Sequence, residues 1–180
     1  MITETHIQAC QQYDRYAQKA IYNYTVDRLY KVSLRYCRDT HEAKDVLHDA
    51  FIKIFTKVTT FEGTPSNFEK WMTRIVVNQA LENYRRQKKI VFTEDSELNY
   101  TEQFIQPSIF AHMELENIKL IIEQLPDPLK INFKLYVIDG FSHREIAELL
   151  NIKESTSRSG VSRAKKALHH LISKSKCSSK

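Results

Sequence analysis

The sequence predicts an all-α protein made of two small helical domains joined by an acidic linker, the second domain with a helix-turn-helix. Glycine occurs three times and proline four times in 180 residues, and a fold of many strands needs more of these residues for its hairpins. In addition, apolar residues recur at the spacing of an amphipathic helix through several segments. With 42% hydrophobic residues, the chain can bury one modest core or two small ones.

Two helices are expected within residues 3–37, where an apolar side is formed by Ile7, Tyr16, Ala17, Ile21, Leu29 and Val32. The segment 43–58 has the clearest pattern, with an apolar face of Val46, Leu47, Ala50, Phe51, Ile54, Phe55 and Val58. Its opposite face carries Asp45, His48, Asp49, Ile52 and Thr56. An apolar Ile52 between two acids is typical of an anchor for a protein partner, although single exposed apolar residues are also ordinary.

A loop at 59–65 leads to the next helix, which Ser66 and Glu69 are expected to open as a capping box. The inner side of this helix is expected to carry Phe68, Trp71, Met72, Ile75, Val76 and Ala80. The helix runs into a basic cluster of Arg85, Arg86, Lys88 and Lys89. The pattern therefore indicates a helix with one apolar face and a cationic end.

Charge is distributed unevenly along the chain, whose formal net charge is +5. From residue 153 to the end there are eight Lys or Arg and one acid, which gives +7, so residues 1–152 sum to −2. Residues 91–117 hold six acids and no Lys or Arg. We therefore expect a first domain at 1–90, a linker at 91–112 and a second domain at 113–180. Basic clusters at helix ends indicate contacts with phosphates, although a solvated basic surface has the same composition.

The last sixty residues contain the pattern of a helix-turn-helix. Helices are expected at 115–125 and 129–138; a capping box of Ser142 and Glu145 then opens a short helix, and a turn at 151–154 precedes a longer one. The longer helix is expected to bury Val161, Ala164, Leu168 and Leu171. Its outward face carries Thr156, Ser159, Ser162, Arg163 and Lys166, with Arg158 at the flank. Hydroxyls and cations at this place suit reading of the major groove, while an ordinary pair of packed helices is the alternative.

Several other classes of protein are not supported. No run of about 18 apolar residues and no N-terminal signal sequence is present, so we expect a cytoplasmic protein without a membrane span. The three cysteines, Cys10, Cys37 and Cys177, are far apart and lack the spacing of a metal site or a disulfide framework. We expect neither a metal nor another cofactor.

Two segments carry recognisable motifs. Residues 30–89 contain AKDVLHDAFIKIF, FEKWMTRIVVNQAL and ENYRRQKK, and residues 125–168 read LPDPLKINFKLYVIDGFSHREIAELLNIKESTSRSGVSRAKKAL. In this order they resemble domains 2 and 4 of the sigma-70 family, in its extracytoplasmic-function (ECF) group. The resemblance covers most of the chain and implies an alternative RNA polymerase sigma factor. The partners that it implies are core RNA polymerase (β′ and β subunits), promoter DNA and an anti-sigma factor.

The resemblance also implies roles for individual residues. The clamp helices of the polymerase β′ subunit would bind Asp45, His48, Asp49 and Ile52. The −10 element would be bound and opened by Phe61, Phe68, Arg74, Asn78, Arg85 and Arg86. Among these, Asn78 and the loop 59–68 fall where the family captures a base flipped out of the non-template strand. The −35 element would be read by Thr156, Arg158, Ser159, Ser162, Arg163 and Lys166.

Some of these positions also have structural explanations. Phe68 and Trp71 lie on the apolar side of their helix and fit a packing role, and Asn78 fits a buried amide that ties two helices together. Gly160 departs from the family pattern, in which a longer side chain is usual, and a glycine inside a helix costs about 1 kcal/mol relative to alanine. At this place it would let the backbone approach DNA closely or remove one base contact.

Two other functions are weighed against a sigma factor. A conventional helix-turn-helix regulator, with the N-terminal half as sensor or dimeriser, would bind DNA without a polymerase. An enzyme would use Asp45 and Asp49 with His41 or His48 as acid-base or metal groups. No second cluster of ligands and no Gly-rich phosphate loop accompanies those residues in the sequence. The sequence therefore favours a transcription factor that is not an enzyme.

Overall fold

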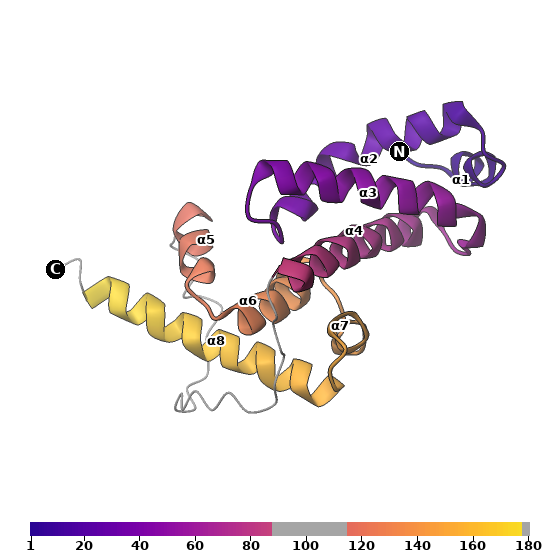
Figure 1. Ribbon diagram of the computed structural model, residues 1–180. Coiled ribbons are helices and arrows are strands. Elements are labelled where there is room, and N and C mark those ends of the chain that lie inside the picture. The colour runs from indigo at the N-terminus through magenta and orange to yellow at the C-terminus, as the bar shows by residue number, and fades with distance from the viewer. Residues whose placement is uncertain (88–114, 178–180) are drawn as a thin grey trace. The chain divides into compact units, whose positions relative to one another are not determined.

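The computed structural model describes residues 1–87 and 115–177. Within these ranges every regular element is helical, and the chain divides into two compact units, Met1–Lys89 and Ile90–Lys180 (Figure 1). The predicted all-α class with two helical domains is thereby confirmed. The acidic linker predicted at 91–112 lies outside the described residues.

The first unit is a bundle of amphipathic helices. Its elements are α1 (Glu4–Gln11), α2 (Arg15–Leu34), α3 (Thr40–Lys57), the 3-10 turn η1 (Val58–Thr60) and α4 (Pro65–Gln87). Each of α2, α3 and α4 packs against the other two, and α1 packs on α2 and η1 (Figure 1). The fully buried side chains include Ile21, Leu29, Val46, Ile54, Phe68, Met72 and Val76. Burial of side chains of this size stabilises the fold by about 1.5–3 kcal/mol each.

The start of α2 is fixed by a side-chain cap. Asp14 Oδ1 accepts a hydrogen bond from the backbone N–H of Ala17 at 2.7 Å, so the helix begins at Arg15. This start turns Ala17 and Ile21 toward the core and leaves Tyr16 85% exposed. The prediction that Tyr16 lies on the apolar side is wrong, because a step of one residue turns a side chain by about 100° around the helix.

The start of α4 also differs from the prediction. The capping box of Ser66 and Glu69 is wrong, because Pro65 is already helical and Thr64 Oγ1 accepts the N–H three residues on at 3.4 Å. Proline suits the first helical position, since it needs no donor there and its φ is preset. Glu69 instead forms an ion pair with Arg28 of α2 at 2.9 Å. The glutamate that seemed to cap one helix therefore joins two.

The second unit is built around one long helix. Its elements are α5 (Leu115–Glu123), α6 (Asp127–Phe133), the π-helical turn η3 (Lys134–Ile138), α7 (His143–Leu150) and α8 (Glu154–Cys177). Helices α5, α6 and α7 all pack on α8 (Figure 1). The buried apolar side chains include Ile122, Leu125, Leu129, Phe133, Ile146, Leu150, Val161, Ala164, Leu168 and Ile172. The apolar spacing predicted for the last helix therefore corresponds to its packed face.

Two prolines fix the junction between α5 and α6. The helix predicted at 129–138 begins two residues earlier, at Asp127, with Pro126 as N-cap and Pro128 in the first turn. The first N–H groups of a helix have no partner within it, so proline is tolerated at this place. The proline pair therefore opens α6 rather than preceding it.

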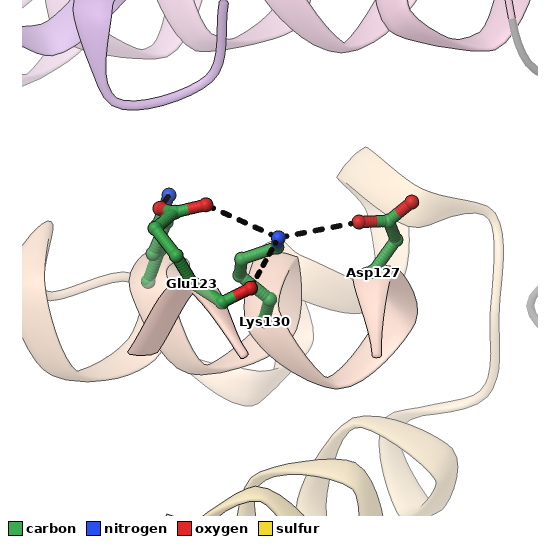
Figure 2. Close-up of polar contacts among 4 residues, drawn as sticks. Glu123, Asp127 and Lys130 are labelled. Atoms are coloured by element: carbon green, nitrogen blue, oxygen red, sulfur yellow. Dashed lines mark hydrogen bonds and ion pairs between the residues drawn. The ribbon is translucent and has the colours of Figure 1, made fainter. Parts of the chain in front are cut away.

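A cluster of charged side chains ties the end of α5 to α6 (Figure 2). Lys130 Nζ donates to Glu123 Oε2 at 3.1 Å and to the Glu123 carbonyl oxygen at 3.2 Å, and it pairs with Asp127 Oδ1 at 3.3 Å. Glu123 also pairs with Lys134 at 2.7 Å. Burial raises the pKa of Glu123, but hydrogen bonds and charges from the two lysines outweigh it, and the pKa lies below its ordinary value. The carboxylate is therefore held in its ionised form.

Candidate functional sites

The outer face of α3 has the composition that the sequence predicts. Because Ala43, Val46, Ala50 and Ile54 are buried against the bundle, the opposite side faces solvent. This side exposes Asp45, His48, Asp49 and Ile52. Ile52 is 54% exposed, so an apolar side chain stands between two acids, where a partner could cover it.

The acids on this face are held by neighbours. Asp45 Oδ2 lies 3.1 Å from His41 Nδ1, one helical turn away. Asp49 Oδ2 accepts a hydrogen bond at 3.1 Å from Nε2 of Gln79, a residue of α4 that is 4% exposed. The Gln79 contact was not predicted from the sequence, in which two adjacent amides, Asn78 and Gln79, interrupt the apolar residues from Val76 to Leu81 and only the second is buried. Asp49 is therefore oriented from beneath the face that it presents.

Three aromatic rings meet where η1 leads into α4. Ring centroids lie 4.9 Å apart for Phe61 and Phe68, 5.3 Å for Phe61 and Trp71, and 5.4 Å for Phe68 and Trp71. The side chain of Gln11 supports this loop by donating to the carbonyl oxygens of Val58 at 3.1 Å and Phe61 at 2.9 Å. Phe61 and Phe68 are buried and Trp71 is half-buried, so the packing interpretation of Phe68 is correct. The accessible ring of this cluster is that of Trp71.

The polar residues of α4 predicted to bind DNA are half-buried or exposed. Asn78 is exposed, so the alternative of a buried amide at this position is wrong; the next residue, Gln79, is the buried one. Arg74 is half-buried and Arg85 is exposed, as is Arg86, which pairs with Glu82 at 2.6 Å. The Arg86 hydrogen bond, with the Lys53 hydrogen bond and charge, lowers the pKa of Glu82. The predicted −10 residues therefore separate into a buried aromatic pair and an accessible polar set.

The helix-turn-helix of the second unit consists of α7, a tight turn and α8. Ser142 and Glu145 form the predicted capping box at the start of α7. Asn151 ends α7 in the left-handed conformation, with φ 54° and ψ 51°, and the N–H of Ile152 bonds the Ala147 carbonyl at 3.0 Å. Asparagine tolerates this backbone conformation better than most residues. The turn thus redirects the chain within a few residues, as a helix-turn-helix requires.

The outward face of α8 is polar and cationic near its N-terminus. Arg158, Ser159 and Ser162 are exposed, whereas Thr156, Arg163 and Lys166 are half-buried. Arg158 pairs with Glu154 one turn earlier. Lys165, which was not among the predicted residues, is also exposed, and its Nζ lies 5.8 Å from the centroid of the Tyr136 ring. The exposed members of the predicted set are therefore Arg158, Ser159 and Ser162, and Lys165 is a further exposed cation of α8.

Gly160 does not face this outward surface. It is buried, and a Cβ atom at this position would lie 2.2 Å from Nδ2 of Asn132 in α6. The two expectations for Gly160, close approach to DNA or loss of a base contact, are therefore wrong. A side chain at position 160 would therefore require the Asn132 amide to move.

Comparison with known proteins identifies the family. The sigma-70 region 2 family matches residues 21–90, and the sigma-70 region 4 family matches residues 115–168. The ECF RNA polymerase sigma-E factor of Haemophilus influenzae is 30% identical over 145 residues, which cover 73% of this chain and 75% of that protein. The chain belongs to the ECF sigma-factor family.

Other members of the ECF sigma-factor family extend the match. SigW of Bacillus subtilis is 28% identical over 184 residues, 96% of this chain and 97% of that protein. SigE of Mycolicibacterium smegmatis is 28% identical over 152 residues, 82% of this chain but 58% of that protein. The solved structures of CnrH with the cytosolic domain of CnrY, and of RpoE with the anti-sigma factor NepR from Bartonella quintana, share this fold. Their TM-scores are both 0.58, with 18% and 23% identity, and they match 94% and 86% of this chain and 96% of each solved chain.

Membership of the ECF sigma-factor family accounts for the division of the sites. The acidic face of α3 and the polar side of α4 lie within the region 2 match, and the helix-turn-helix lies within the region 4 match. Across residues 1–87 and 115–177, His, Cys, Asp and Glu form no group of three that could hold a metal ion. In the same ranges, no helix combines the length and apolar character that crossing a membrane requires.

Proposed function

We propose that this chain is an alternative sigma factor that directs promoter-specific initiation by core RNA polymerase. The observation that carries the proposal is the presence, in one chain, of an acidic face anchored by Ile52 and a helix-turn-helix with a cationic face. Residues 1–90 would bind core polymerase and the −10 element, residues 91–112 would link the domains, and residues 113–180 would read the −35 element. The chain would act in the cytoplasm and would catalyse no reaction of its own, since the polymerase performs the chemistry.

The first part of the proposal assigns the core contact to Asp45, His48, Asp49 and Ile52. An apolar anchor with a polar rim is the arrangement from which interfaces derive most of their affinity. Ile52→Asp and Asp49→Ala should each weaken binding of core polymerase by roughly tenfold or more, the effect of an anchor residue. Fluorescence anisotropy of labelled chain titrated with core enzyme measures this, and Lys44→Ala, an exposed change elsewhere on α3, serves as the control. Unchanged affinity in both variants would remove this assignment.

The second part assigns the −10 element to the α4 region. Asn78 would hydrogen-bond a base flipped from the non-template strand, and the Trp71 ring would lie beside that base. Phe61 and Phe68 would support the Trp71 ring from below. Phosphates of the opened strand would be bound by Arg74, which is half-buried, and by Arg85 and Arg86, which are exposed.

In the reconstituted holoenzyme, Asn78→Ala should slow formation of the open complex and spare core binding, because the amide contacts DNA only after the duplex opens. Permanganate reactivity of thymines at the −10 element reports this step directly. Asn83→Ala, a half-buried amide on the same helix, is the matched control. Normal reactivity combined with a clear loss of thermal stability would assign Asn78 a structural role instead.

The third part assigns the −35 element to Thr156, Arg158, Ser159, Ser162, Arg163 and Lys166. A base-reading arginine discriminates between sequences, whereas a phosphate contact weakens binding to all sequences about equally. Arg163→Ala should therefore flatten the preference among −35 variants. Lys166→Ala should lower affinity for every variant and reduce the slope of log affinity against log salt by about 0.9. Equal losses for every −35 sequence with parallel salt slopes would contradict this division.

Regulation by a protein inhibitor is part of the proposal. Solved relatives of the same fold were captured with CnrY and with the anti-sigma factor NepR, and we expect this chain to bind an anti-sigma factor as well. The alternative of a free-standing regulator is tested by footprinting with and without core polymerase on a promoter selected from a random library. Protection and transcription that depend on core polymerase are expected. Sequence-specific protection by the chain alone, with no transcription, would favour the regulator.

A further inference from the structure

The interface between α6 and α8 contains a buried polar pair. Asn132 of α6 is 3% exposed, and Ser157 of α8 is fully buried. Asn132 Nδ2 donates to the Ser157 carbonyl oxygen at 3.1 Å, and Ser157 Oγ donates to Asn132 Oδ1 at 3.2 Å. Polar groups buried in this way cost free energy unless each finds its partner. The pair therefore favours one arrangement of the two helices over neighbouring arrangements that apolar contacts alone would tolerate.

Gly160 makes this arrangement sterically possible. Residues 157 and 160 lie one turn apart on the same side of α8, so Asn132 contacts Ser157 and occupies the space above Gly160. Since a Cβ at position 160 would lie 2.2 Å from Asn132 Nδ2, even an alanine would move the side chain or the helix. Asn132 and Gly160 thus fix both the rotation of α8 and its distance from α6.

His143, at the start of α7, contacts the same buried polar pair of Asn132 and Ser157. His143 Nδ1 lies 3.0 Å from Ser157 Oγ, and the His143 ring stacks on Tyr136 of η3 with centroids 4.3 Å apart. The Ser157 hydroxyl has one proton, which it donates to Asn132 Oδ1, so the bond from His143 requires the ring proton on Nδ1. One hydroxyl therefore connects α6, α7 and α8 beneath the N-terminal part of the outward face.

We propose that Asn132 is a positioning residue for recognition of the −35 element. It does not face DNA itself. By holding both the carbonyl and the hydroxyl of Ser157, it sets the direction in which the exposed Arg158 and Ser159 of the following positions point. Successive side chains point about 100° apart around a helix. A rotation of α8 about its axis would therefore turn Arg158 and Ser159 away from the base edges. This inference rests on the function proposed above.

The test uses holoenzyme assembled from core polymerase and the full chain, on a promoter with matched and substituted −35 elements. The readout is the ratio of transcripts from the two, which does not depend on the fraction of folded protein. Asn132→Ala should lower this ratio roughly fivefold or more, the discrimination that one misplaced base contact removes. Leu129→Ala, which removes a buried apolar side chain from the same helix, should destabilise the protein but leave the ratio unchanged.

An unchanged ratio for Asn132→Ala, or an equal loss for Leu129→Ala, would overturn the inference. If Asn132→Ala does not assemble, Ser157→Ala decides the matter, because it removes only the hydroxyl and should lower the ratio in the same direction. ¹⁵N NMR of the full chain should show the Nδ1–H form of His143, and Ser157→Ala should shift that signal. A wild-type holoenzyme without any −35 preference would overturn the proposed function and this inference with it. If the wild-type holoenzyme prefers the matched −35 element and the variants keep the same transcript ratio, only the inference would be overturned.

Discussion

Replacing Gln79 by leucine should weaken the binding of core RNA polymerase without lowering the stability of the protein. The Gln79 amide donates to Asp49 Oδ2 at 3.1 Å and so orients a carboxylate on the face that we assign to the polymerase. Gln79 Oε1 is buried and has no hydrogen-bond partner among the described residues. Leucine has a similar volume and removes both features of the amide together.

The expected magnitudes follow from these contacts. Loss of a hydrogen bond to an exposed carboxylate costs about 1 kcal/mol after solvent screening, and removal of the unpartnered buried Oε1 recovers about 1–3 kcal/mol. The free energy of unfolding should therefore equal the wild-type value or exceed it by up to about 2 kcal/mol. For binding, Asp49 must be ordered on docking, at about 0.5–1.5 kcal/mol for one side chain. The affinity for core polymerase should thus fall by roughly two- to tenfold.

A double-mutant cycle with Asp49→Ala gives the decisive comparison. Urea unfolding measures stability, and anisotropy titration with core polymerase measures affinity for the wild type, the two single variants and the double variant. Because Gln79 acts through Asp49, Gln79→Leu should have no further effect on affinity once Asp49 is alanine. Additive losses would refute the reasoning, and so would wild-type affinity of Gln79→Leu beside a weakened Asp49→Ala.

Three further predictions concern the rest of the chain. Burial and the charge of Arg158 lower the pKa of His143 below its ordinary 6.5. The unfolded state therefore takes up a proton first, and the stability of the protein should fall as pH drops below 6.5. The difference in unfolding temperature between about pH 7.5 and pH 5 should be smaller for His143→Gln than for the wild type. Burial raises the pKa of Cys10 to about 11 and that of Cys37 to about 12. In a Cys177→Ser background, both thiols should therefore react with Ellman's reagent at pH 8 far more slowly than free cysteine does. Reaction at the rate of free cysteine would contradict this prediction. Lys130→Met should lower the free energy of unfolding by about 1–2 kcal/mol in urea, because it removes the tie between α5 and α6; an unchanged value would mean that the cluster adds nothing.

Patterns within a single helix were predicted well. The outer face of α3 depends only on which of its own residues are apolar, so the exposure of Ile52 followed from the spacing. The capping box at Ser142 is likewise local, since its partner lies three residues on. The predicted start of α4 was wrong although a helix start is also a local feature. Thr64 and Ser66 could each cap this helix, and proline at the first helical position favours the cap at Thr64.

Features that depend on a second helix could not be predicted. The assignment of Gly160 to the DNA face was wrong. The role of this glycine is set by Asn132, which lies 28 positions earlier in another helix, and the pattern of α8 alone does not show that contact. The contact between Gln79 and Asp49 joins residues 30 apart, and no periodicity within either helix indicates it. The prediction that Tyr16 lies on the apolar side failed for a related reason. Which residues of α2 are buried, Ala17 among them, depends on how this helix packs against its neighbours. The roles in binding polymerase and promoter remain predictions, because they depend on molecules outside the chain.

The close contact between Gly160 and Asn132 limits how this protein can be redesigned. Promoter preference in a helix-turn-helix invites the exchange of one recognition helix for another. Here a transplanted α8 with any side chain at position 160 would collide with Asn132, whose amide lies only 2.2 Å from the place of the first added carbon. A transplant that keeps glycine but lacks the serine hydroxyl would strand the amide oxygen. Helices α6 and α8 therefore form one exchangeable module, and a chimera should have its boundary before Asp127 rather than at the turn.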